Sequence, residues 1–365
     1  MAPTPADIAP LHQIGWPTAG SAAEAAWQEV LGAHPHARPA RVIEQHRSGY
    51  VVADAPGAAI RAESLPEWQR PRFPAHERPA VGDWVLLEGE RIVTLLPRRT
   101  AVKRGAAGEH YHQQVVAANI DTVFVVCGLD DDFNPRRIER YLLLVGNGGA
   151  RPVVVLTKAD RNDEAALAVA ALADVATLGV PVLAVNAKDA ASVAGLAAWL
   201  EPGCTVALVG SSGAGKSTLT NTLLGVEKMK TGEVRGNDSR GRHTTTYRAL
   251  IPLPSGACLI DTPGMRELKP TGEEDLVDGG FSDIEALAGE CRFRNCSHRH
   301  EPGCAVLAAI ERGELEQGRY RNYLKLGEEV AAAAAKLAAR TAQNAANKPA
   351  GKPPRKPSGT KHGRH

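Results

Sequence analysis

The chain has 365 residues, enough for about two or three domains, and its 43% apolar and 23% charged residues are typical of a soluble globular protein. It has no apolar run of about eighteen residues that would form a transmembrane helix, and residues 1–10 lack the basic and apolar regions of a secretory signal. We therefore expect a cytoplasmic protein that does not enter a membrane and acts as a monomer.

The first two segments of the chain have different compositions. Residues 1–38 are rich in Ala and Pro and predict an extension with one short helix over 21–31, anchored by Trp16 and Trp27. Residues 39–104 contain short apolar runs separated by Gly and Pro turns, which predicts a small OB-fold β-barrel. The expected strands are 41–45, 50–53, 58–62, 83–87 and 91–96. The basic residues that follow, Arg98, Arg99, Lys103 and Arg104, form either a solvated rim or a surface that contacts the RNA backbone.

Residues 112–284 alternate apolar β-type runs with helical stretches, which predicts a mostly parallel sheet covered by helices on both faces. Ligands of such folds bind at the carboxyl ends of the strands. The expected strands are 120–127, 152–156, 180–185, 205–209 and 258–260, and a further strand is expected over 247–253. The expected helices are 135–147, 162–178, 190–200 and 216–224.

A phosphate-binding loop follows the strand at 205–209 and precedes a helix, which is the context that a P-loop requires. Its glycines let backbone N–H groups turn toward phosphates, Lys216 is expected to reach the β- and γ-phosphates, and Ser217 to ligate Mg²⁺. The loop and the helix start that we expect to bind nucleotide comprise Gly210, Ser211, Ser212, Gly213, Ala214, Gly215, Lys216, Ser217 and Thr218.

Two further motifs end strands of the same sheet. Asp261-Thr262-Pro263-Gly264 has the form of a switch II, in which Asp261 holds Mg²⁺ and the Gly264 amide meets the γ-phosphate. In Thr157-Lys158-Ala159-Asp160, the Asp160 carboxylate can accept the N1–H and the exocyclic amine of guanine, and the Lys158 stem can cover the base. The usual motif begins with Asn rather than Thr157. Asn186-Ala187-Lys188 is a weaker match for the loop behind the guanine.

The loop between the P-loop helix and the strand at 247–253 is the expected switch I. Either Thr245 or Thr246 would complete the Mg²⁺ coordination. Met265 stands where Ras-like enzymes carry the Gln that orients the attacking water, so we expect His243 to take that role unless it is a solvated loop residue.

The motifs occur in an unusual order, because the guanine motif precedes the P-loop. A circular permutation preserves the site, since only the strand ends need to meet. It also places switch II directly before the C-terminal domain, which suggests that switch II motion is passed there.

A cluster of three thiols and one imidazole follows within residues 285–335. Cys291, Cys296, His298 and Cys304 form a Cys₃His set suited to one structural tetrahedral Zn²⁺, with His300 as a weaker alternative to His298. Helices are expected over 305–312 and 320–339. Residues 336–365, with many Lys and Pro and no Asp or Glu, are expected to be a disordered basic tail that either solubilises the chain or adds RNA affinity.

Together, the barrel, the order TKAD, GSSGAGKS, RHTTT, DTPG and the Cys₃His cluster resemble the circularly permuted GTPases that act in late maturation of the small ribosomal subunit (the RsgA/YjeQ type). The resemblance implies three RNA-binding parts: an OB-fold, a permuted GTPase domain and a zinc-binding helical domain. It implies binding of GTP and GDP, hydrolysis stimulated by the small ribosomal subunit, and contact with its rRNA.

Two other functions are compatible with parts of the sequence. A P-loop ATPase or kinase would share the phosphate loop, but Asp160 favours guanine. An RNA-binding assembly protein that senses nucleotide and scarcely hydrolyses it would account for Met265.

Overall fold

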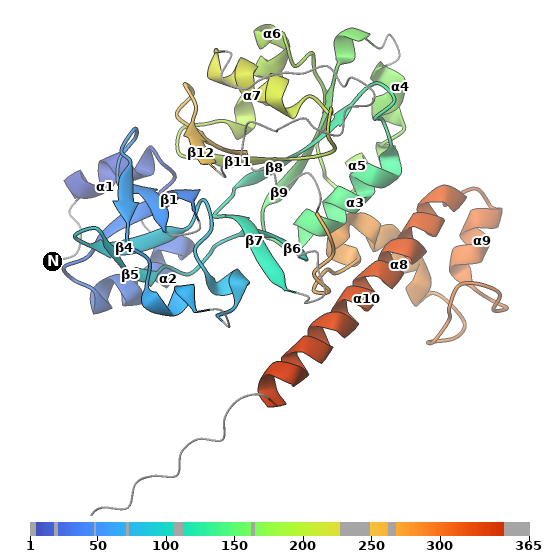
Figure 1. Cartoon of the computed structure of the whole chain (residues 1–365). Helices are drawn as coiled ribbons and strands as arrows, with labels where there is room; N and C mark the ends of the chain where they lie inside the picture. The colour runs from blue at the N-terminus through green and yellow to red at the C-terminus, as the bar shows by residue number, and fades with distance from the viewer. Residues whose placement is uncertain are drawn as a thin grey trace, which may run out of the picture.

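The computed structural model describes residues 5–17, 21–46, 49–70, 73–105, 112–161, 165–226, 249–261 and 268–346. Figure 1 shows the N-terminal β-rich part in blue, a central sheet in green and yellow, and the C-terminal helices in orange and red. The barrel and the C-terminal helices lie on opposite sides of the molecule in this view.

The N-terminal extension packs on the barrel through tryptophans. Helix α2 (Ala22–Ala33) starts at the predicted place, where Ser21 Oγ accepts a hydrogen bond from the Glu24 amide at 3.2 Å. The Trp16 ring centroid lies 4.9 Å from that of Trp27 and 4.8 Å from that of Trp84. The predicted helix and both anchors are therefore confirmed, whereas α1 (Pro5–His12) was not predicted.

Five short strands close the predicted barrel. They are β1 (Arg38–Gln45), β2 (Tyr50–Ala53), β3 (Ile60–Ala62), β4 (Trp84–Glu88) and β5 (Arg91–Leu95). Strand β1 pairs antiparallel with β2 and β4, β2 pairs with β3, and β4 pairs with β5. A parallel bridge between Glu63 and Arg91 joins the end of β3 to β5 and completes the ring.

Three of the basic residues after the barrel form ion pairs within the protein. The Arg98 guanidinium bonds the fully buried Asp83 carboxylate at 2.7 Å and also donates to the carbonyl of Arg78. Arg99 pairs with Asp121 at 3.4 Å, and Lys103 pairs with Glu273 at 2.8 Å. Arg98 is therefore not part of a solvated rim, because its side chain is only 19% exposed and compensates the buried charge of Asp83. RNA contact by the basic residues stays a prediction.

The central sheet has the predicted architecture. Strands β10 (Val182–Ala184), β9 (Arg151–Thr157), β8 (Thr122–Gly128), β11 (Thr205–Val209) and β13 (Cys258–Asp261) are parallel neighbours in that order. Strand β12 (Ala249–Pro252) lies antiparallel beside β13 and also pairs with β1 through Ala249 and Glu44, so the sheet continues into the barrel.

Helices cover both faces of this sheet. Side chains along each strand point alternately to one face and the other, and both faces are apolar and must be buried. On β8, Val123 and Val125 belong to one core cluster and Phe124 and Val126 to the other. The helices are α3 (Pro135–Gly146), α4 (Ala165–Ala170), α5 (Ala173–Thr177), α6 (Ala190–Val193) with a 3₁₀ turn at Ala194–Trp199, and α7 (Lys216–Leu224). Two helices, α4 and α5, stand where one was predicted over 162–178. A hairpin of β6 (Ala101–Gly105) and β7 (Gln113–Ala118) was not predicted.

The C-terminal part consists of α8 (Ser282–Gly289), α9 (Ala305–Glu311) and α10 (Gln317–Ala346), preceded by a short helical turn at Val277–Phe281. Its apolar core includes Phe281, Val306 and Leu326, together with Leu143 from α3 of the central part. Helix α10 reaches well beyond the other helices in Figure 1.

Helix α10 also corrects the predicted start of the basic tail. The helix expected over 320–339 extends to residue 346, so residues 336–346, which were assigned to the disordered tail, are helical. Their many alanines have the highest helix propensity, which outweighs the lack of a packed core there.

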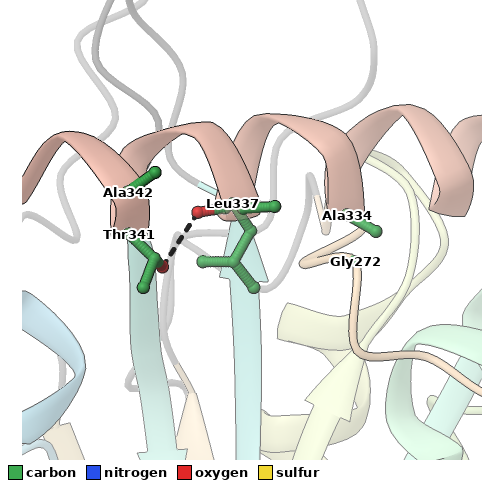
Figure 2. A pocket seen from close by; sticks show the side chains of 6 residues that line it. Gly272, Ala334, Leu337, Thr341 and Ala342 are labelled. Atoms are coloured by element: carbon green, nitrogen blue, oxygen red, sulfur yellow. Dashed lines mark hydrogen bonds between the residues drawn. The ribbon is translucent and has the colours of Figure 1, made fainter. Parts of the chain in front are cut away.

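An open apolar groove of about 560 Å³ runs beside this part of α10 (Figure 2), lined by Gly272, Ala334, Leu337, Ala338, Thr341 and Ala342. Among the described helices, none combines the length and apolar character needed to span a membrane.

Candidate nucleotide-binding site and metal centre

The predicted nucleotide motifs meet at one edge of the central sheet. Strand β9 ends at Thr157, β10 at Ala184, β11 at Val209 and β13 at Asp261. Because these strands are parallel, their carboxyl ends lie at the same edge. The strand ends at Thr157 and Asp261 are more than a hundred residues apart in the sequence, yet they lie at the same edge.

The P-loop occupies residues 210–217 between β11 and α7. Gly210 has a φ of 144°, and a Cβ atom there would lie 2.1 Å from the carbonyl oxygen of Val126, so only glycine fits. Helix α7 begins at Lys216, which directs its free N–H groups toward the loop. The loop therefore has the backbone geometry of a phosphate-binding site.

Lys216 is held within this loop. Its ammonium donates hydrogen bonds to the carbonyl oxygens of Gly210, at 2.7 Å, and Ser211, and the residue is only 6% exposed. Ser217 and Thr218 lie half-buried in the first turn of α7, and Ser212 and Gly213 are exposed. The predicted phosphate-binding residues are therefore brought together at one helix start.

The guanine motif is tied directly to the P-loop. Thr157 is fully buried, and its hydroxyl donates a hydrogen bond to the Ala214 carbonyl at 2.6 Å. A Cβ atom on Gly215, whose φ is 90°, would lie 2.8 Å from the same hydroxyl oxygen. The unusual first residue of the motif thus fixes the distance between the guanine loop and the phosphate loop.

Lys158 and Asp160 follow at the end of β9. Lys158 has a φ of 62°, a conformation that is rare for a side-chain-bearing residue and is often found at functional sites. Its ammonium pairs with Asp130 at 2.5 Å. Partial burial raises the pKa of the Asp130 carboxyl, but hydrogen bonding and charge from Lys158 outweigh this and hold the pKa below its usual value. Asp160 is exposed in a short 3₁₀ turn.

The loop at 186–188 lies next to this motif, as predicted. The Ala159 amide donates to the carbonyl of Val185 at 3.3 Å. Asn186 Oδ1 accepts from the Lys188 amide at 3.0 Å, and the Thr222 hydroxyl of α7 donates to the Ala187 carbonyl at 2.6 Å. Asn186 and Ala187 are thus held between the guanine motif and the P-loop helix.

Of the predicted switch residues, the structure places only Asp261. It ends β13 opposite Ala249 and is 7% exposed. His243, Thr245, Thr246, Gly264 and Met265 lie outside the described residues, so the roles given to them stay predictions.

Two residues at this edge were missed in the sequence. Asp130 and Asp132 follow β8, and they contact Lys158 and Ser211 respectively. The sequence pattern could have indicated them, because β8 is an apolar strand closely followed by acidic residues, at the same sheet edge as the motifs.

The metal centre is formed by the loop between α8 and α9. The ligand atoms of Cys291, Cys296, His298 and Cys304 all lie within 4.8 Å of one another. The His298 Nδ1 atom is 3.5 Å from the sulfurs of Cys291 and Cys304, which are themselves 3.9 Å apart. A tetrahedral zinc ion with Zn–S bonds of about 2.3 Å needs sulfurs about 3.8 Å apart, so the four residues fit this ion. His300 does not belong to the cluster.

Local structure supports the ligands. Cys304 caps α9, and its sulfur accepts a hydrogen bond from the Leu307 amide at 3.5 Å. The Tyr320 hydroxyl of α10 donates to the carbonyl of His298, which has a φ of 56°. The ligand loop is therefore fixed to both following helices.

Comparisons with known proteins agree with this site. Residues 95–271 match the family model described as RsgA GTPase. The chain is 72% identical, over 92% of its own length and 93% of the relative's, to a protein of Xanthomonas euvesicatoria pv. vesicatoria called "Small ribosomal subunit biogenesis GTPase RsgA". A protein of the same name from Xanthomonas campestris pv. campestris is 70% identical, over 92% of this chain and 93% of that protein.

Solved structures show the same fold. The crystal structure of YjeQ from Thermotoga maritima covers 80% of this chain and 98% of its own, with 24% identity and a TM-score of 0.58. YloQ, described as a circularly permuted GTPase, covers 81% of this chain and 96% of its own, with 24% identity and a TM-score of 0.57. With its match to the family model and its 72% identity to the protein of Xanthomonas euvesicatoria pv. vesicatoria, this chain belongs to the RsgA GTPase family.

Proposed function

We propose that this chain is a GTP hydrolase that acts in biogenesis of the small ribosomal subunit, the role that the names of its relatives give them. The observation that carries the proposal is the hydrogen bond from Thr157 to Ala214, which joins a guanine motif to a P-loop. A P-loop alone fits an ATPase equally well. The hydrogen bond joins the P-loop to the motif that contains Asp160, whose carboxylate can accept both donors of guanine, and this favours GTP.

Each predicted site residue has its own role in nucleotide binding. Lys216 and the amides of the P-loop hold the β- and γ-phosphates, and Asp160 accepts the two guanine donors. Ser217 and Asp261 would hold Mg²⁺, which neutralises charge on the phosphate oxygens when it is bound. Thr245 or Thr246 closes over the γ-phosphate, Gly264 donates its amide to it, and His243 positions water.

The proposal divides the chain into three domains. They are an OB-fold domain over 39–104, a permuted GTPase domain over 112–284, and a domain over 285–335 that is stabilised by one structural Zn²⁺. Contact with rRNA of the small subunit is supported by the zinc loop, where Phe293 is 41% exposed between the exposed Arg292 and Arg294. An exposed aromatic ring and guanidinium groups suit an unpaired base and its phosphates. A protein that works on the small ribosomal subunit would act in the cytoplasm.

The first test is GTP turnover by the purified chain with and without small ribosomal subunits. We expect a large stimulation by the subunits that Lys216→Ala abolishes, because the variant lacks the charge that meets the phosphates. Tight GTP binding with no stimulation would contradict a subunit-dependent hydrolase.

A second test addresses the base. Asp160→Asn replaces one acceptor oxygen with a donor, so affinity is expected to shift from GDP toward xanthosine diphosphate. An unchanged preference for GDP would remove Asp160 from the guanine site.

A further inference from the structure

The segment between β8 and α3 carries three consecutive aspartates, Asp130, Asp131 and Asp132. Strand β8 lies between β9, which leads into the guanine motif, and β11, which leads into the P-loop. The aspartate segment therefore begins between the two halves of the nucleotide site. None of the motifs that define the site includes it.

Asp132 holds the start of the P-loop. The Ser211 hydroxyl lies 2.6 and 2.7 Å from its two carboxylate oxygens, and the Gly128 amide donates to one of them at 3.1 Å. Arg137, in the first turns of α3, pairs with the same carboxylate. The charge is thus compensated, and the side chain is only 13% exposed. Asp132 connects the end of β8, the P-loop and α3.

Asp130 holds the guanine side. Its carboxylate pairs with the Lys158 ammonium at 2.5 Å and also accepts a hydrogen bond from the Asp132 amide at 3.3 Å. The left-handed backbone of Lys158 sets the direction in which its side chain leaves the strand, and Asp130 fixes the far end of that side chain. The two aspartates are therefore linked to each other and to opposite halves of the site.

We propose that Asp130 and Asp132 are positioning residues for nucleotide binding, with Asp132 acting on the phosphate loop through Ser211 and Asp130 acting on the base side through Lys158. The inference rests on the proposed function. In this proposal the carboxylates do not bind the nucleotide, because Asp130 is engaged by Lys158 and Asp132 by Ser211 and Arg137. They keep the donors that do so in the bound arrangement, which lowers the entropy lost on binding.

Asp131 provides a matched control. It belongs to the same segment, carries the same charge and is exposed, and within the described residues it forms no hydrogen bond or ion pair. Replacing each aspartate by Ala therefore changes the net charge equally. Any difference among the three variants reports the contacts.

The experiment measures the dissociation constants of GDP and GTP for the full chain and for Asp130→Ala, Asp131→Ala and Asp132→Ala. We expect Asp130→Ala and Asp132→Ala to raise both constants about tenfold, the effect of losing one charge-assisted hydrogen bond, and Asp131→Ala to leave them within about twofold. Asp132→Asn, which keeps an acceptor for Ser211, should recover part of the loss. Equal constants for all three Ala variants would overturn the proposal.

A double-mutant cycle separates positioning from general destabilisation. If Asp132 acts through Ser211, then Asp132→Ala should have little effect on GDP affinity in a Ser211→Ala background. The same loss of GDP affinity in both backgrounds would overturn this role. The role would also be overturned if Asp132→Ala destabilised the nucleotide-free protein, as seen in its melting temperature, enough to account for the whole loss of affinity. Failure of the unaltered chain and of Asp131→Ala to bind GTP would instead overturn the proposed function, and the inference with it.

Discussion

At the residue scale, Thr157 decides how the two halves of the nucleotide site are joined. Its side chain is fully buried and its hydroxyl donates to the Ala214 carbonyl, so it connects the chain at β9 to the P-loop after β11. The base-contacting amide of the more common Asn is lost at this position. In the proposed function, guanine recognition depends on Asp160 and the loop at 186–188, while the Thr157 hydroxyl links the guanine motif to the P-loop.

The prediction at this scale concerns that hydroxyl. Thr157→Val keeps the shape of the side chain but leaves the Ala214 carbonyl without this donor, so GDP affinity should fall about tenfold. Thr157→Ser keeps the hydroxyl and serves as the control. Equilibrium titration of GDP checks both, and equal affinity for the Val and Ser variants would show that the hydroxyl is dispensable.

At the element scale, the loop between α8 and α9 depends on its metal ligands. This loop contains little regular structure, and three exposed arginines and an exposed Phe293 indicate a surface rather than a core. What holds it is the Cys₃His cluster, the cap that Cys304 provides to α9, and the hydrogen bond from Tyr320. A loop of this kind is ordered by the metal rather than by apolar burial.

Removal of the metal should therefore unfold this element while sparing the nucleotide site. We expect one zinc ion per chain, lost in Cys296→Ser and on treatment with a strong chelator, together with new protease cleavage within 291–304. GDP affinity should stay within about twofold, because the ligand loop belongs to the C-terminal part and the nucleotide motifs to the central sheet. Cys204→Ser, a half-buried thiol outside the cluster, should keep its zinc. Full zinc content in Cys296→Ser would exclude that ligand.

At the scale of the whole molecule, α3 joins the GTPase sheet to the C-terminal helices. Most of its apolar residues belong to the core of the sheet, but Leu143 belongs to the core of the C-terminal part. The guanidinium of Arg319, on α10, bonds Glu139 of α3 at 3.0 Å and Asp283 of α8 at 2.8 Å, and it is 1% exposed. Helix α3 is therefore in contact with both the sheet and the C-terminal helices. That switch II motion is passed to the C-terminal domain stays a prediction.

The prediction at this scale concerns the buried ion pairs. Arg319→Met removes the cation and leaves Glu139 with Arg136 and Asn322, so the free energy of unfolding should fall by about 3 kcal/mol. Adding Glu139→Gln should restore part of it, because this removes a buried charge that has lost one of its two cationic partners. Thermal or urea unfolding measures both, with the exposed Arg321→Met as control. A loss no larger than that of the control would mean that these ion pairs do not hold the domains together.

The sequence alone determined the elements and the chemistry of the sites. Apolar runs of strand length, helical periodicity, the P-loop and the Cys₃His spacing act locally, so the barrel strands, the parallel sheet and the four zinc ligands were predicted close to their observed places. It did not reveal what depends on contacts between distant segments. Only the tertiary structure showed that Arg98 neutralises a buried Asp83, that Thr157 bonds the P-loop, and that Asp130 and Asp132 lie between the guanine motif and the phosphate loop. Their roles follow from the order of strands in the sheet, which brings together residues far apart in the chain and which no local pattern encodes.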